Sequence, residues 1–356
     1  RYYEETAPAG DPVAQAAAAQ LAGRRLPMID RVEVAIVDEN QPRWLAFLNG
    51  EHDVIEEVPP EYTGLAVPND ELAPHLRKAG LTMVRYAEPG VTFSYFNMED
   101  PMVGGYEPHQ IALRRAMALA VDVDKEIRLV RNRQAIPAQG AIAPGTWGHD
   151  PAFKSEMSEH DPARAKALLD LYGYTDRDGD GWRERPDGSP LRVEYATQPD
   201  QQSRQLVEQW QKNMAAIGVR IEFKTGRWPE NLKASRAGKL MMWGATWFSS
   251  QPDGDTFLAL AYGGAKGNPN RSRFDLPSFD RLYERQKVMP DVPERAAVMR
   301  DAQRLMIAYM PLKAHVHRVH TDLAQPWVIG YHRNPFLYAW WHYVDVNPER
   351  RPAPKP

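Results

Sequence analysis

Short β-rich runs alternate with helical stretches along most of this chain, and that alternation limits its fold more than any other feature. Residues 32–37 (VEVAIV) alternate in polarity as a strand does, residues 41–49 have helical spacing and stop before Gly50, and residues 52–58 indicate another strand. Strand, helix and strand in this order favour a crossover between parallel strands. The sequence therefore predicts an α/β fold.

The same alternation continues toward the C-terminus. Asp161 is placed as the N-cap of a helix, with proline at the first helical position and Gly173 as its stop. Further strands are expected at residues 81–86, 91–97, 191–197, 219–225, 240–243 and 315–323. Further helices are expected at residues 109–122, 125–131, 161–172, 201–217, 231–237, 275–289 and 293–310.

Length and composition exclude several classes of function. The chain has 356 residues, enough for two domains, and a net charge of −3 without any Lys/Arg-rich block, so nucleic acid is not an expected partner. It has no cysteine, which excludes disulfides, thiolate metal sites and a cysteine nucleophile. No apolar run approaches the roughly 18 residues of a membrane span. The sequence begins at Arg1 without a signal peptide, as a mature secreted protein or a truncated one would.

The segment from Trp228 to Leu258 carries the clearest candidate site. An apolar run at residues 240–243 is expected to be a buried strand that opens into a loop with two indoles and several polar groups, which is how an α/β domain builds a ligand site. The alternative is that both indoles belong to the core. The predicted ligand contacts are Trp243, Thr246, Trp247, Phe248 and Ser250, with Tyr95 and Asn97 from an earlier strand and Arg236 as a partner for a carboxylate.

An acidic loop at residues 176–187 partly matches the pattern of a calcium-binding loop. Asp176, Asp178 and Asp180 fit the opening of an EF-hand loop, with Asp187 at its twelfth position. That position normally holds a glutamate, and a helix and a strand flank the loop instead of two helices. The pattern therefore favours a turn over a metal site, and no cofactor is expected.

Two other clusters could suggest chemistry. His315 and His317 share one face of a predicted strand while His320 points to the other, and two ligands on one strand do not complete a zinc site. Asp253 and Asp255 could serve a glycoside hydrolase, but carboxylates two residues apart rarely reach opposite sides of a bond, and capping of the following helix is favoured. The sequence contains none of the common nucleophile or phosphate-binding motifs in a suitable context. We therefore do not expect an enzyme.

Five segments in one order resemble the extracellular solute-binding protein family 5, the oligopeptide, dipeptide and nickel receptors of ABC importers. They are residues 43–60 (RWLAFLNGEHDVIEEVPP), 106–127 (with RRAMALAVDVDKEI), 135–150 (AIPAQGAIAPGTWGHD), 161–191 and 206–258. Together they extend over most of the chain.

The resemblance implies a periplasmic-binding-protein-like α/β fold with two lobes and an extra subdomain, of which this chain would be the C-terminal portion without the N-terminal part. Residues 1–96 would form part of the first lobe, residues 97–325 the second lobe, and residues 326–356 the return to the first. The implied function is capture of a peptide-like or other small solute, in the periplasm or another extracytoplasmic space, and its delivery to the membrane permease of an ABC transporter.

One departure from the family pattern bears on the solute. In the peptide receptors a carboxylate three residues after the tryptophan matching Trp247 anchors the amino terminus of the peptide, and Ser250 stands at that position here. A serine carries no charge to pair with an ammonium group. The alternative to a working receptor is an interaction module whose ligand site has degenerated.

Overall fold

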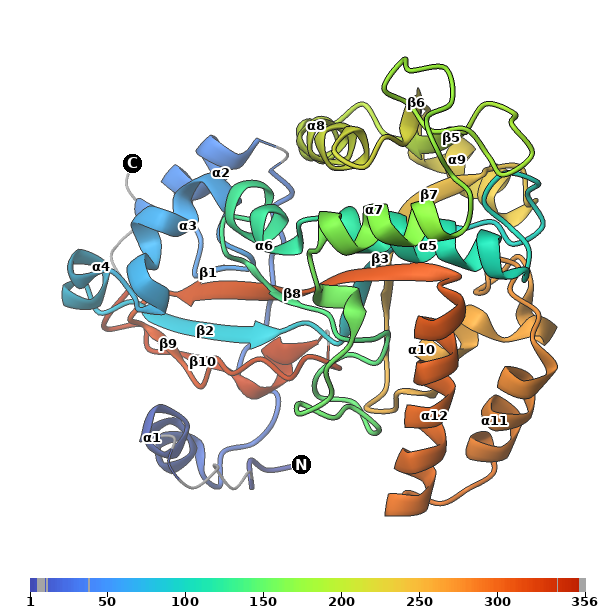
Figure 1. Ribbon diagram of the computed structural model, residues 1–356. Coiled ribbons are helices and arrows are strands. Elements are labelled where there is room, and N and C mark those ends of the chain that lie inside the picture. Colours follow the sequence, from blue (N-terminus) through green and yellow to red (C-terminus); the bar gives the residue numbers. More distant parts are fainter. Residues whose placement is uncertain (5–9, 11, 38, 338, 352–356) are drawn as a thin grey trace. The chain divides into compact units, whose positions relative to one another are not determined.

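The computed structural model describes residues 1–4, 10, 12–37, 39–337 and 339–351, and the chain divides into two compact units (Figure 1). Unit 1 comprises Arg1–Ala87 and Val319–Pro356, and unit 2 comprises Glu88–Arg318. The assignment of residues 1–96, 97–325 and 326–356 to lobes remains a prediction.

Unit 2 is built on a mixed sheet in which the strand order is β8, β3, β7, β5, β6. β3 pairs antiparallel with β7 over its whole length, from Gly90 opposite Phe248 to Phe96 opposite Met242, while β5 pairs parallel with β6 and, at Ala196, with β7. The strands are β3 (Gly90–Phe96), β4 (Ala135–Pro137), β5 (Arg192–Thr197), β6 (Arg220–Thr225), β7 (Met242–Phe248) and the first part of β8 (Leu312–Ala324).

Helices surround this sheet, and α5 and α7 lie side by side (Figure 1). Asp161 caps α7 as expected, accepting a hydrogen bond from the backbone amide of Arg164. The core contains Leu113, Met117, Trp243 and Phe257, all fully buried. The helices are α5 (Pro108–Ala120), α6 (Val123–Lys125, followed by a π-helical turn at Glu126–Val130), α7 (Pro162–Leu171), α8 (Gln201–Ala215), α9 (Trp228–Arg236), α10 (Asp255–Leu258), α11 (Pro277–Lys287) and α12 (Pro293–Tyr309).

Unit 1 has a smaller core around Trp44, Phe47 and Leu323. β2 pairs antiparallel with the C-terminal part of β8, from Thr82 opposite Ala324 to Ala87 opposite Val319. The elements of unit 1 are α1 (Pro12–Leu21), α2 (Asn40–Leu48), β1 (Val54–Ile55), α3 (Pro60–Ala66), α4 (Pro74–Lys78), β2 (Thr82–Ala87), β9 (Val328–Ile329) and β10 (Asp345–Val346).

The predicted parallel crossover in residues 32–58 is wrong. Residues 31–37 form no strand, and Val34 and Ile36 are 76% and 88% exposed, so the apolar side chains of that run have nothing to pack against. β1 is two residues long and pairs antiparallel with β8. The helix predicted between residues 32–37 and 52–58 is present as α2. Gly50 follows it with a φ of 77°, as the predicted C-terminal glycine should. Parallel pairing occurs instead at β5, β6 and β7.

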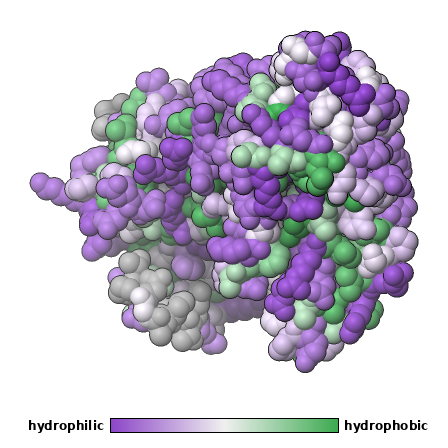
Figure 2. All heavy atoms as spheres, viewed as in Figure 1, coloured by the Kyte–Doolittle hydropathy of each residue, from purple (hydrophilic) through white to green (hydrophobic). Residues whose placement is uncertain are grey.

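On the face shown in Figure 2, hydrophilic residues predominate and hydrophobic residues lie among them. Among the described residues, no helix has the length and apolar character that crossing a bilayer requires.

Candidate functional site

β7 begins at Met242, two residues after the predicted start of the strand, and continues into residues that the sequence predicted as a loop. It continues through Phe248 because β3 pairs with it to that residue. Side chains of a strand alternate between its two faces, so Gly244, Thr246 and Phe248 share one face and Trp243 and Trp247 the other. The prediction that a loop carries the two indoles is therefore wrong, because Trp243 and Trp247 both lie on β7.

The face with Gly244, Thr246 and Phe248 lines a pocket of about 310 Å³ inside unit 2, which we call the β7 pocket. This volume lies near the lower end of the range for ligand sites, about 300–1,000 Å³. Phe248 and Trp228 are 42% and 45% exposed while lining it, so they present aromatic surface to solvent. The other lining residues include Thr92, Ser94, Tyr195, Thr197, Gln198, Gln202, Leu206, Trp210, Phe223 and Arg318.

Gly244 makes room for one wall of this pocket. A Cβ atom at this position would lie 2.6 Å from the hydroxyl of Tyr195, closer than real contacts allow. That hydroxyl lies 2.6 Å from Oγ of Ser94, whose Oγ is also 2.9 Å from Nε2 of His315. The glycine therefore permits a polar chain that joins three strands, β5, β3 and β8, beneath the pocket.

Buried charges continue this chain. Nδ1 of His315 lies 3.2 Å from Oε2 of Glu126, and Arg131 contacts Oε1 of Glu126 through Nε at 2.8 Å and Nη2 at 2.7 Å. Burial alone would raise the pKa of Glu126, but Arg131 and His315 outweigh it and bring that pKa to about 2. Burial lowers the pKa of His315 more than Glu126 raises it, so the imidazole is favoured in its neutral form.

Three of the predicted ligand residues are interior residues. Trp243 is fully buried and its Nε1 donates to Oε1 of Gln198 over 3.3 Å. The hydroxyl of Tyr95 donates to Oγ of Ser235 over 2.7 Å, and Nδ2 of Asn97 donates to the backbone carbonyls of Gly238 and Leu240. None of the three lines the β7 pocket. Their role as ligand contacts stays a prediction.

The remaining predicted residues are accessible to different degrees. Thr246 is half-buried, with its Oγ1 3.0 Å from Oγ1 of Thr92 and accepting from Nη2 of Arg318 over 3.0 Å. Trp247 is half-buried and donates from Nε1 to Oγ1 of Thr256 over 3.2 Å. Ser250 is exposed just beyond β7, and Arg236 is exposed in the last turn of α9.

Several pocket residues were missed by sequence reasoning. Tyr195, Trp210 and Phe223 come from β5, α8 and β6, where an apolar side chain at regular spacing is indistinguishable from an ordinary core residue. Glu126 and Arg131 stand in a π-helical turn, and only the long-range contact with His315 on β8 reveals their role.

Asp253 is used structurally. Its Oδ1 accepts from the backbone amide of Asp255 over 3.0 Å at the start of α10, and its Oδ2 lies 2.9 Å from Nη1 of the buried Arg295. The N-cap of α10 is Gly254, so Asp253 supports the start of the helix from the residue before the cap, while Asp255 lies inside the first turn. A carboxylate held in an ion pair beside its neighbour lacks the opposed placement of a hydrolase pair.

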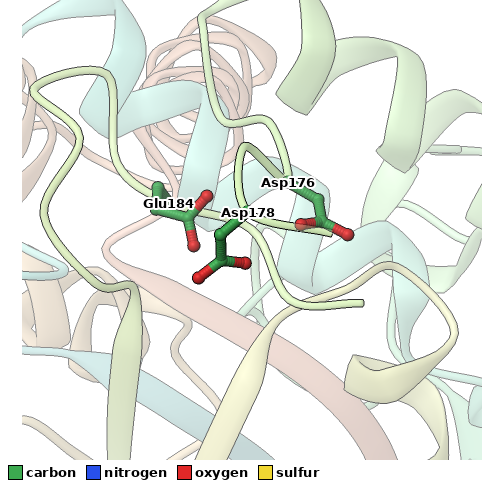
Figure 3. Close-up of side chains that lie close together, drawn as sticks. All are labelled: Asp176, Asp178 and Glu184. Carbon is green, nitrogen blue, oxygen red and sulfur yellow. The ribbon is translucent and has the colours of Figure 1, made fainter. Parts of the chain in front are cut away.

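The acidic loop brings together a different set from the predicted one. Carboxylate oxygens of Asp176, Asp178 and Glu184 lie within 4.8 Å of one another (Figure 3). Asp180 instead contacts Arg220 at 3.2 Å, and Asp187 accepts from Ser189. Both oxygens of Asp176 accept backbone amides, from Gly179 and Gly181, which are bonds of a turn. The predicted set of Asp176, Asp178, Asp180 and Asp187 is therefore not assembled.

The three histidines of β8 have separate surroundings. His315 belongs to the chain beneath the β7 pocket, His317 contacts the backbone carbonyl of Gly90 through Nδ1 at 2.8 Å, and the ring of His320 stacks on Tyr86. Burial lowers the pKa of His317 to about 4. This fits the favoured interpretation of a packed histidine-bearing strand.

Comparisons with known proteins agree on one family. Residues 4–269 match the family model for bacterial extracellular solute-binding proteins, family 5 Middle. The chain is 29% identical over 227 residues to the di/tripeptide-binding protein 2 of Pseudomonas aeruginosa, covering 63% of this chain and 40% of that protein. It is 26% identical over 324 residues to heme-binding protein A of Haemophilus influenzae, covering 90% and 54% respectively. The chain thus spans about half the length of the curated relatives it matches.

Solved structures share the fold. HbpA2 from Haemophilus parasuis superposes with a TM-score of 0.71 at 21% identity, covering 90% of this chain and 59% of that one. The periplasmic binding protein DppA from Helicobacter pylori, solved with a peptide, superposes with a TM-score of 0.69 at 20% identity, covering 87% and 56%. With a family model matched over more than half of its residues, the chain belongs to the bacterial extracellular solute-binding proteins of family 5.

Proposed function

We propose that this chain is the solute-binding part of an extracytoplasmic receptor that captures a peptide-like or other small solute for the membrane permease of an ABC importer. Family membership supports this role, and relatives named as dipeptide- and di/tripeptide-binding proteins support the solute class. The observation that carries the proposal is the β7 pocket, which is lined by two exposed aromatic rings, by hydroxyl and amide side chains, and by the buried ion pair of Glu126 and Arg131.

The pocket is suited to reversible binding. Trp228 and Phe248 offer apolar faces that a solute can cover, and each such contact removes apolar area from water. Thr92, Thr246 and Gln202 can donate and accept hydrogen bonds without imposing a charge. Affinity then comes from desolvation and shape, and no bond of the solute has to break.

The pocket size and Ser250 together limit which solutes the chain could bind. About 310 Å³ accommodates one side chain or a small ring system and not a whole oligopeptide. By the resemblance to the peptide receptors, Ser250 stands where they carry an anchoring carboxylate, so we infer that the amino terminus of a solute receives no ion pair from this position. We infer a small solute with an apolar or aromatic end that enters the β7 pocket.

The experiment is a thermal-shift screen of the full chain with dipeptides, tripeptides, monosaccharides and haem, followed by calorimetry on any compound that raises Tm. Phe248→Ala and Trp228→Ala are each expected to weaken binding at least about tenfold, as removal of a central aromatic contact does. The control is Val288→Ala, an 84% exposed residue outside the pocket, which should bind like the wild type.

Two outcomes oppose the proposal. If no compound shifts Tm, the chain behaves as an interaction module without a working ligand site. If a compound binds but both aromatic variants retain wild-type affinity, the solute does not use the β7 pocket.

A further inference from the structure

Arg271 is a cation in unit 2 to which no described residue offers a carboxylate. It is 7% exposed, and its Nε is sealed from solvent without a hydrogen-bond partner. Its guanidinium lies over the rings of Trp243 and Trp247, 5.6 and 6.0 Å from their centroids. These are the two indoles that the sequence singled out, on the face of β7 opposite the pocket.

The other buried arginines of this unit are paired. Arg114 donates to the backbone carbonyls of Val103 and Tyr309, Arg131 pairs with Glu126, and Arg295 contacts Asp253 and Asp291. Proteins rarely bury a charge without such partners, because desolvation of an ion is costly. Two ring faces compensate only in part.

The electrostatics around Arg271 also favour an anion. Burial lowers the pKa of Arg271, the Tyr95 hydroxyl opposes this effect, and the nearby guanidinium of Arg236 adds to it. Arg236 is exposed and Trp247 is half-buried, so solvent reaches this group of residues from their side. Two cations and a pair of indoles therefore lie close together, and no described carboxylate pairs with either cation.

The backbone beneath Arg271 is fixed by its neighbours. The side chain of Asn270 is fully buried, donates to the carbonyls of Tyr262 and Phe274, and accepts from the hydroxyl of Ser272. The carbonyl of Ser272 accepts the amide of Met98 over 2.7 Å. The backbone that carries Arg271 is thus held in place before any ligand arrives, which reduces the entropy lost on binding.

We propose that Arg271, stacked over Trp243 and Trp247, binds a carboxylate group of the solute, with Arg236 as a second cation on its solvent side. A planar guanidinium can donate two parallel hydrogen bonds to a carboxylate, which makes this group the matching anion. The inference rests on the proposed function, since it names the charged end of the captured solute.

The test compares tripeptides that carry a free carboxyl group with the same tripeptides as C-terminal amides, by calorimetry. In the wild type the acids are expected to bind at least about tenfold tighter than the amides, and in Arg271→Gln the difference should vanish. Arg271→Lys should retain part of the preference, since it keeps a charge without the paired donors. The matched control is Arg285→Gln on the exposed face of α11, which should keep the full preference.

The outcomes separate this inference from the proposed function. If acids and amides bind the wild type equally, Arg271 is not the carboxylate ligand although the receptor stands. If no tripeptide binds, succinate is titrated into the protein while tryptophan fluorescence is recorded. This measurement tests the carboxylate site independently of the proposed function. Quenching in the wild type that is lost in Arg271→Gln supports it, because Trp243 and Trp247 report on this guanidinium, and unchanged fluorescence overturns it.

Stability provides a control for misfolding. Replacing an unpaired buried cation with an apolar side chain of similar length should not weaken the fold. Arg271→Met is therefore expected to melt at the wild-type temperature or above while losing the acid preference. A fall in Tm would indicate a structural role and contradict the inference.

Discussion

The two faces of β7 differ in accessibility and in how their charged groups are paired. One face places Thr246 and the 42% exposed Phe248 on the β7 pocket, where Arg131 pairs with Glu126. The other places the fully buried Trp243 beside Trp247, under an arginine to which no described residue offers a carboxylate. Strand alternation puts these environments within one residue of each other. Trp228 lines the β7 pocket and also packs on Trp243, with ring centroids 4.9 Å apart, so the two environments meet at these aromatic rings.

The largest effect expected from this comparison is on stability. Trp243→Ala should lower the free energy of unfolding by about 3–5 kcal/mol, because a fully buried indole leaves a cavity. Phe248→Ala should change it by about 0.5 kcal/mol or less, as at most exposed positions. Urea unfolding of both variants measures the difference, and equal losses would mean that the two faces are not distinct.

An effect of intermediate size concerns acid. Glu126 has a folded-state pKa near 2, below its ordinary value of 4.5, so its contribution is present above pH 4.5 and is lost as pH falls toward 2. Burial lowers the pKa of His315 below its ordinary value of 6.5, so this residue also makes the protein less stable as the pH falls below 6.5. Together they should make stability fall on acidification, by on the order of 3 kcal/mol for Glu126.

Urea midpoints measured from pH 7 to pH 2.5 test this expectation with Glu126→Gln. The variant should be less stable at pH 7 and show a flatter acid limb, because Arg131 and His315 lose their partner at every pH. His160→Gln, at an exposed position, serves as the control and should follow the wild type. An acid limb in Glu126→Gln as steep as the wild-type one would contradict the assignment.

The smallest effect concerns the hydroxyl group of Thr246. Thr246→Val keeps the shape of the side chain but removes contacts with Thr92 and Arg318, so the free energy of unfolding should fall by about 1 kcal/mol. Thr225→Val, at an exposed position on β6, is the matched control and should have little effect. A Thr246→Val protein as stable as the wild type would show that these hydrogen bonds merely replace bonds to water.

The elements that the sequence predicted well are those with local signals. α7 begins at an aspartate cap and a proline, and α2 ends before a glycine with positive φ, both as expected. Residues 32–37 have the alternation of a strand but no sheet to pair with, which a local pattern does not reveal. The strand predicted at residues 240–243 overlaps β7 at Met242 and Trp243, but the continuation of β7 to Phe248 depends on pairing with β3, more than 140 residues away.

The pocket was indicated only where its residues are close in sequence. Thr246 and Phe248, which follow a buried run next to tryptophans, line the β7 pocket, and their role as ligand contacts stays a prediction. Arg271 was missed because a single arginine in a loop has no periodicity, and only the fold shows that it lies over Trp243 and Trp247 without a carboxylate. Glu126 and His315 were missed as a pair because 189 residues separate two groups that lie 3.2 Å apart.

The most direct test of the central claim is a crystal structure of the protein with the tripeptide acid that raises its Tm most. The account predicts that the apolar end of the peptide lies against Trp228 and Phe248 and that its carboxylate is within hydrogen-bond distance of Arg271. A peptide bound elsewhere, with both faces of β7 free of it, would contradict the account.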